Sequence, residues 1–214
     1  MSVSPVDFAS LLCSRLCHDL LSPVGALNNG LELLGDEPDE EMRARVFALL
    51  SESARTSANK LKFFRLAFGA GGGFGERIDV REAKTAIEGL LADNKRTSLG
   101  WMVEGDALPK TAIKVLLNLA LIANEALVRG GTLDVAGEEN GGQIEIAVKI
   151  EGPRIILDPD LRRTLADGAG EGDVTPRAAA AYLVNTLVAE AGGTVQVSEP
   201  AESVMILGAV FNAG

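Results

Sequence analysis

The sequence is poor in the residues that form metal sites, disulfide frameworks and nucleic-acid interfaces. It has 214 residues with 1 histidine, 2 cysteines and 1 tryptophan, and 20 Lys and Arg against 30 Asp and Glu. Cys13 and Cys17 lie four residues apart in a helical pattern, which is not the spacing of a disulfide framework. No second histidine is present to complete a zinc site. We therefore expect no metal site. The formal net charge of -10 opposes binding to a phosphate backbone, so we also expect no nucleic-acid partner.

Long apolar runs are also lacking. The most apolar stretch, residues 115–128, is interrupted by Asn118, Asn124 and Glu125 and is too short to span a bilayer. Residues 1–9 have neither the charged start nor the apolar centre of a signal peptide. The composition, 47% hydrophobic and 23% charged, is that of a globular protein. We therefore expect a cytoplasmic protein without a membrane partner.

Glycine is concentrated at one place and divides the chain into two parts. Five of the seven residues in 69–75 are glycine, a composition that predicts a hinge or linker because regular structure there is entropically costly. We expect a helical domain over residues 1–70 and an α/β domain over residues 76–214.

Two long helical patterns precede the glycines. Residues 6–34 carry a continuous apolar stripe, about eight turns long at 3.6 residues per turn. After Gly35 and Pro38, which favour a helix end and a helix start, residues 39–68 carry a second apolar side. Two antiparallel helices bury only part of such surfaces against each other. We therefore expect a homodimer in which a second copy completes a four-helix bundle.

The second part of the chain alternates between helical and strand patterns. Apolar periodicity predicts helices at residues 80–92, 109–128 and 175–192, and strands at residues 99–103, 132–135, 143–150, 194–198 and 203–211. Such an order predicts a mostly antiparallel or mixed sheet with helices on one face, an α/β sandwich. The expected fold class of the whole chain is α+β, a long helical hairpin followed by this sandwich.

His18 and Asp19 are the candidate catalytic residues. On a helical wheel His18 lies opposite the apolar stripe, so its imidazole faces solvent and can act as a nucleophile near neutral pH. Asp19 can hydrogen-bond one ring nitrogen or receive its proton, which leaves the other nitrogen free to attack. Pro23 removes a backbone hydrogen bond near the carbonyl of Asp19 and bends the helix. A lone histidine is more often an ordinary surface residue. The solvent-facing position, together with Asp19 and Pro23, favours a functional role for His18.

Small polar side chains occupy the helical turns that follow the histidine, where another protein can approach the backbone closely. On the two turns before it, one cationic and one apolar side chain flank the same face. The candidate partner-binding residues are Leu11, Arg15, Ser22, Gly25 and Asn29. An ordinary solvated helix face is the alternative interpretation.

The segment from His18 to Pro23, His-Asp-x-x-x-Pro on the first helix of a hairpin, resembles the phosphoacceptor motif of histidine kinases. The resemblance implies an ATP-binding second domain, but the nucleotide motifs depart from the family pattern. Ala120 stands where the family has a Glu four residues before Asn124, and Asn118 is an alternative candidate for that asparagine.

The glycine-rich nucleotide motifs are degenerate as well. Ile150 replaces the adenine-reading Asp and cannot accept its hydrogen bond, and Arg154 replaces a glycine at which nucleotide passes close to the chain. Residues 175–181, rich in alanine, replace the glycines that cradle phosphate at a helix N-terminus. We therefore expect the second domain not to bind ATP.

An intact phosphoacceptor hairpin followed by a degenerate ATPase-like domain is similar to the ChpT-type histidine phosphotransferases of alphaproteobacteria. The similarity spans nearly the whole chain and is most specific at residues 15–19 and 65–69. It implies a homodimer that passes phosphoryl groups through His18, from the receiver domain of a hybrid histidine kinase to response regulators of the cell cycle. It implies no cofactor on this chain, with Mg2+ brought by the partner receiver domain. The alternatives are a non-catalytic receiver- or kinase-binding adaptor or inhibitor, and an active autokinase.

Overall fold

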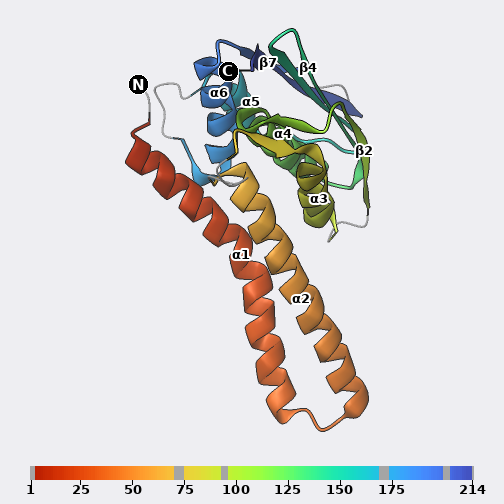
Figure 1. Ribbon diagram of the computed structural model, residues 1–214. Coiled ribbons are helices and arrows are strands. Elements are labelled where there is room, and N and C mark those ends of the chain that lie inside the picture. The colour runs from red at the N-terminus through yellow and green to blue at the C-terminus, as the bar shows by residue number, and fades with distance from the viewer. Residues whose placement is uncertain (1–2, 70–74, 93–95, 169–173, 200–202, 214) are drawn as a thin grey trace.

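The computed structural model describes residues 3–69, 75–92, 96–168, 174–199 and 203–213. Its first half is a hairpin of two long helices, α1 (Pro5–Asp36) and α2 (Glu40–Ala67) (Figure 1). Ser4 caps α1 by accepting a hydrogen bond from the backbone N–H of Asp7, and Asp39 caps α2 in the same way. The predicted hairpin is therefore confirmed, with helix ends within two residues of the expected ones.

The two helices approach closely where α1 has a glycine. A Cβ at Gly30 would lie 2.8 Å from Cδ2 of Leu50 and 3.6 Å from Cγ1 of Val46, so the absence of a side chain lets α2 pack here. Pro23 lies inside α1, and Figure 1 shows the helix changing direction part-way along its length. The hairpin is thus a bent, closely packed pair.

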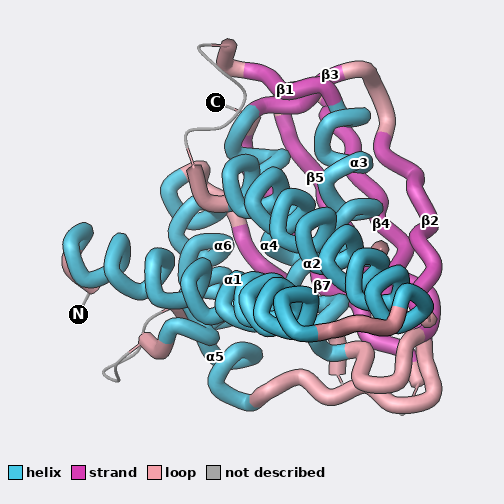
Figure 2. Tube along the Cα trace, turned by 90° about the horizontal axis from the view of Figure 1, so that it is seen from below, coloured by secondary structure: helices cyan, strands magenta, loops and turns pink. Residues whose placement is uncertain are grey.

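The second half of the chain is a layer of helices on a mixed sheet. In order, its elements are β1 (Arg77–Asp79), α3 (Val80–Leu91), β2 (Thr97–Val103), β3 (Ala107–Pro109), α4 (Lys110–Ala126), β4 (Gly131–Asn140), β5 (Gln143–Glu151), α5 (Pro159–Asp167), the 3-10 turn η1 (Pro176–Ala178), α6 (Ala179–Glu190), β6 (Thr194–Val197) and β7 (Val204–Asn212). The five-stranded sheet has the order β2-β4-β5-β7-β6. Only the β2–β4 pair among these strands is parallel. Helices α3, α4 and α6 lie side by side on one face, which confirms the expected sandwich (Figures 1 and 2).

Three elements were not predicted, and one strand is longer than expected. Strands β1 and β3 pair with each other over three residues each, too few to show an alternating pattern. Helix α5 is short and polar, with only Leu161, Thr164 and Leu165 buried. Strand β4 continues past residue 135 because it pairs with β5, although Ala136 and Gly137 supply little apolar side chain. Most of the predicted glycine linker, residues 70–74, lies outside the described residues, and the domain boundaries remain a prediction.

The core of the sandwich extends into the top of the hairpin. Helix α4 is buried on nearly all sides, and the end of α2 contributes Phe63, Phe64, Leu66 and Ala67 to the same core. Asn118 of α4 donates from Nδ2 to the carbonyl of Ala67 at 3.0 Å. The second domain is therefore packed directly on α2. None of the helices in the described part of the chain has both the length and the apolar character of a membrane span.

Candidate functional site

His18 lies on α1 at the level where the hairpin meets the second domain. Its side chain is 85% exposed, and Nδ1 lies 3.1 Å from Oδ1 of Asp19. An imidazole protonated on Nδ1 donates this hydrogen bond, which leaves the lone pair of Nε2 free. Exposure and a free ring nitrogen are the properties expected of a nucleophile that another protein must reach.

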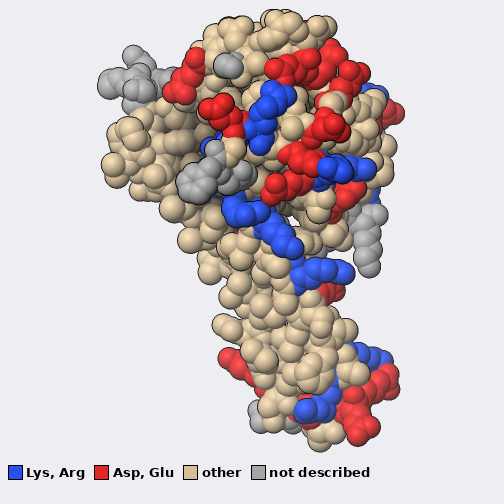
Figure 3. All heavy atoms as spheres, in the orientation of Figure 1, with Lys and Arg blue, Asp and Glu red and all other residues tan. Residues whose placement is uncertain are grey.

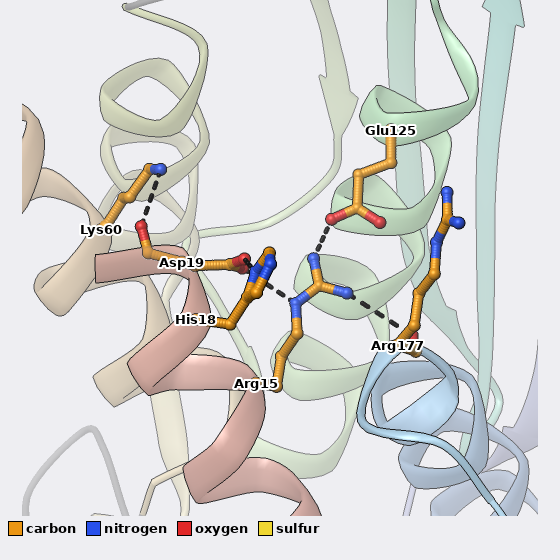
Figure 4. A network of polar contacts seen from close by, with 6 residues as sticks. All are labelled: Arg15, His18, Asp19, Lys60, Glu125 and Arg177. Atoms are coloured by element: carbon orange, nitrogen blue, oxygen red, sulfur yellow. Dashed lines mark hydrogen bonds and ion pairs between the residues drawn. The ribbon is translucent and has the colours of Figure 1, made fainter. Parts of the chain in front are cut away.

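Asp19 is held from two sides (Figure 4). Arg15, one turn earlier on α1, donates from Nε to Oδ2 of Asp19 at 2.8 Å. Lys60 of α2 donates from Nζ to the backbone carbonyl of Asp19 at 3.0 Å. That carbonyl has no helical donor because Pro23, four residues on, lacks an N–H. The proline thus creates an acceptor that ties α2 to the site.

Arg15 is buried, although its spacing on the helix predicts a place on the docking face. Its Nη2 donates to Oε1 of Glu125 at the end of α4, and its Nη1 donates to the carbonyl of Arg177 at 3.5 Å. Burial opposes the charged form, but the carboxylates of Glu125 and Asp19 outweigh it, and the pKa of Arg15 is raised. The prediction that Arg15 offers a cationic contact to a partner is therefore corrected: its guanidinium is bound within the chain.

A groove of about 650 Å³ opens beside the histidine between α1 and the second domain. One wall comes from α1 and the other from the end of α4 and η1. Its lining residues are Ser14, Arg15, His18, Asp19, Glu125, Thr175, Pro176 and Arg177. The guanidinium of Arg177 is largely exposed and lies 3.6 Å from a carboxylate oxygen of Asp158. The histidine thus borders a groove with polar walls from both domains.

The other predicted partner-binding residues lie along α1. Ser22 and Asn29 are exposed, and Leu11 is half-buried. Gly25 has no heavy atom within 4 Å of the position that a Cβ would take, its own helix aside. These four residues leave the helix surface open to a partner, and their role in binding remains a prediction.

The residues at the positions that contact nucleotide in a kinase include two that are buried within the protein. Ile150 is fully buried on β5 between Leu133 of β4 and Met205 of β7. Asn118 is fully buried and holds the end of α2, whereas Asn124 is half-buried. Ile150 therefore belongs to the apolar core, and Asn118 to the contact between the domains.

Three residues of the polar network around Arg15 and Asp19 were not predicted from the sequence. Glu125 had a visible signal, since it is the one acidic residue in the apolar stretch 115–128. Arg177 stands in the segment that replaces the phosphate-binding glycines, but nothing there indicates that its carbonyl accepts from Arg15. Lys60 is one of several cations on α2, and its contact with Asp19 follows only from the packing of the hairpin.

Comparison with known proteins gives consistent matches. Residues 80–203 match the family model of the histidine phosphotransferase C-terminal domain. Protein phosphotransferase ChpT of Brucella abortus (strain 2308) is 34% identical over 205 residues, 96% of each chain. A solved bacterial phosphotransferase is 33% identical, covers 98% of each chain and gives a TM-score of 0.84. Histidine kinase AdeS of Acinetobacter baumannii covers 92% of this chain and 98% of its own, with 16% identity and a TM-score of 0.47. The two phosphotransferases thus share the hairpin as well as the second domain with this chain.

Proposed function

The chain belongs to the ChpT-type histidine phosphotransferases, and we propose that it relays phosphoryl groups between receiver-domain aspartates through phospho-His18. The observation that carries the proposal is the setting of the histidine. Its ring is 85% exposed, and Asp19 faces Nδ1 at 3.1 Å, so that Nε2 points to an incoming partner as a free nucleophile. Donors and acceptors are the receiver domains of a hybrid histidine kinase and of response regulators.

The reaction consists of two transfers of the same kind. The lone pair of Nε2 attacks the phosphorus of an aspartyl phosphate on the donor. The N–P bond forms while the P–O bond to the aspartyl group breaks, and the electron pair leaves with the donor carboxylate. The proton on Nδ1 stays hydrogen-bonded to Asp19, whose charge stabilises the positive charge developing on the ring. The aspartate of an acceptor receiver then attacks the phosphohistidine and restores the neutral imidazole.

A receiver domain fits the surroundings of His18 in this proposal. Ser22, Gly25 and Asn29 leave room along α1 for close docking, and the groove beside the histidine adds a wall from the second domain. The receiver supplies the Mg2+ and the lysine that neutralise the transferring group, so this chain needs no cofactor of its own. The buried position of Ile150 supports a second domain that serves recognition without binding ATP.

We propose that the working form is a cytoplasmic homodimer joined through the hairpin. Exposed apolar residues recur at seven-residue spacing, Val24 and Leu31 on α1 and Phe47, Ala54 and Leu61 on α2. The middle of the hairpin shows almost only uncharged side chains in Figure 3. The chain exposes 11464 Å². A compact monomer of 22.4 kDa would expose about 9,400 Å². A second hairpin packed on these residues removes part of that excess.

A label-transfer assay tests the proposed function. Purified receiver domains of the same organism are phosphorylated, mixed with the chain, and label on the chain is measured. We expect the wild type and Cys13→Ser, an exposed change on the same helix, to acquire label, and His18→Ala to acquire none. Binding of receivers without label on the wild type would indicate the adaptor function instead. Label acquired from ATP alone would indicate an autokinase.

A further inference from the structure

Arg15 is the one charged residue in the described part of the chain that is buried, with an exposure of 7%. Its guanidinium donates to three acceptors on three elements: Asp19 of α1, Glu125 of α4 and the carbonyl of Arg177 in η1. The planar fork of an arginine suits such simultaneous contacts, whereas a lysine has one compact charged group. The Arg15 side chain thus connects Asp19, which hydrogen-bonds to His18, to the second domain.

We propose that Arg15 is a positioning residue for phosphoryl transfer, and that Glu125, acting through Arg15, makes the contact between Asp19 and His18 depend on the docked second domain. The consequence for catalysis rests on the proposed function. The contacts among His18, Asp19, Arg15 and Glu125 do not depend on it.

The contact between His18 and Asp19 needs an external restraint. Adjacent residues on a helix point about 100° apart and do not face each other as residues three or four apart do. The imidazole is 85% exposed, whereas the Asp19 side chain is 17% exposed. Arg15 binds Oδ2 of Asp19 at 2.8 Å, which leaves Oδ1 directed at Nδ1 of the histidine. The aspartate is therefore the fixed member of the pair, and Arg15 fixes it.

Arg15 itself is held in place by the second domain. A buried guanidinium is unfavourable unless its charge is paired, and Glu125 and Asp19 supply the two carboxylates. If Glu125 moved away with α4, Arg15 would lose one of these partners and could leave Asp19. The orientation of the histidine therefore reports whether the second domain is docked.

Domain docking itself does not depend on Arg15 alone. Asn118 binds the end of α2, Asn59 donates to the carbonyl of Gly89 at 3.2 Å, and Phe8 packs edge-to-face on Tyr182 with ring centroids 5.0 Å apart. These contacts remain when Arg15 is replaced, so a variant should change the histidine without separating the domains.

The experiment uses the fact that the chain has a single histidine. Nitrogen-15 NMR of the full-length protein gives one imidazole signal set, which reports the tautomer of His18 directly. In the wild type we expect the proton mainly on Nδ1, and in Arg15→Met a shift of the population towards Nε2–H. Arg15→Lys keeps a cation, and Glu125→Gln keeps a hydrogen-bond acceptor. Both variants should give tautomer populations between those of the wild type and Arg15→Met. The matched control, Asn59→Ala, removes another contact between hairpin and second domain and should leave the tautomer unchanged.

Phosphoryl uptake from a phosphorylated receiver domain is measured on the same variants. We expect Arg15→Met to lower the rate constant at saturating receiver roughly tenfold to hundredfold, as for a misplaced reacting group, with little change in KM. A wild-type tautomer and rate in Arg15→Met would overturn the inference. If that variant does not fold, wild-type values in both Arg15→Lys and Glu125→Gln would overturn it equally. Failure of the proposed function is distinct, because the wild type would then take up no label while the tautomer still tests the role of Arg15.

Discussion

Replacement of Asn118 by alanine should destabilise the whole chain, because this side chain joins the two domains. Asn118 is fully buried in α4 and donates from Nδ2 to the carbonyls of Ala67 at 3.0 Å and Lys114 at 2.8 Å. Ala67 is the last residue of α2, where the helix itself supplies no donor to the carbonyl. Asn118→Ala therefore leaves a carbonyl without its hydrogen bond in the centre of the contact between hairpin and sandwich.

The magnitude follows from two opposing effects. A buried polar group that loses its partner costs about 1–3 kcal/mol. The buried Oδ1 of Asn118 has no hydrogen-bond partner in the described part of the structure, so its removal offsets part of this cost. We expect a net loss of about 2 kcal/mol, since the lost amide also leaves a small void. For a chain of this size that lowers the Tm by about 4–8 °C.

Thermal unfolding followed by circular dichroism and calorimetry measures this effect. Asn118→Asp is the matched comparison, because it keeps the shape but removes both amide donors and places a carboxylate against two carbonyls. We expect it to be less stable than the alanine variant at neutral pH. An alanine variant within about 0.5 kcal/mol of the wild type would refute the role of Asn118, as would an aspartate variant that is more stable than the alanine variant.

Three further predictions concern the hairpin, a helix cap and the dimer. Gly25→Ala should raise the unfolding free energy by about 0.5–1 kcal/mol because the site is open. Gly30→Ala should raise it less, because its Cβ would meet Cδ2 of Leu50 at 2.8 Å and Leu50 would have to shift; urea unfolding that finds Gly30→Ala the more stable of the two would contradict this. The pKa of Asp79, the cap of α3, is lowered mainly by the hydrogen bond from the Arg81 side chain, so its stabilisation is present above the unfolded-state pKa and is lost as pH falls through the folded one. The stability gap between the wild type and Asp79→Asn should thus stay constant from neutral pH down to the ordinary Asp pKa of about 3.9 and narrow below it, as urea unfolding across that range would show, and a gap that stays constant in acid would contradict it. Phe47→Glu, at a position 53% exposed in the single chain, should convert the proposed dimer to a monomer in sedimentation equilibrium, and an unchanged mass would contradict that interface.

The parts of the fold and site that could be predicted from the sequence are those set by local spacing. The angles among His18, Asp19 and Pro23 follow from helix geometry, and long alternating strands such as β5 have an unmistakable period. Arg15 could not be placed in this way. A helical wheel gives the direction of a side chain on an isolated hairpin, whereas its partner Glu125 lies 110 residues away in the chain. The pairs made by β1 and β3 are likewise long-range, and three residues are too few to carry a periodic signal.

In the proposed function, His18 carries the phosphoryl group between two receiver domains. The most direct measurement places a phosphorylated donor receiver and an unphosphorylated acceptor receiver together and follows the phosphate on each protein with time. We expect label to reach the acceptor only when the wild-type chain is present, with a transient N-phosphoryl signal in phosphorus-31 NMR from the chain. Transfer that proceeds equally with His18→Ala, or without any phosphorylated intermediate on this chain, would contradict the account.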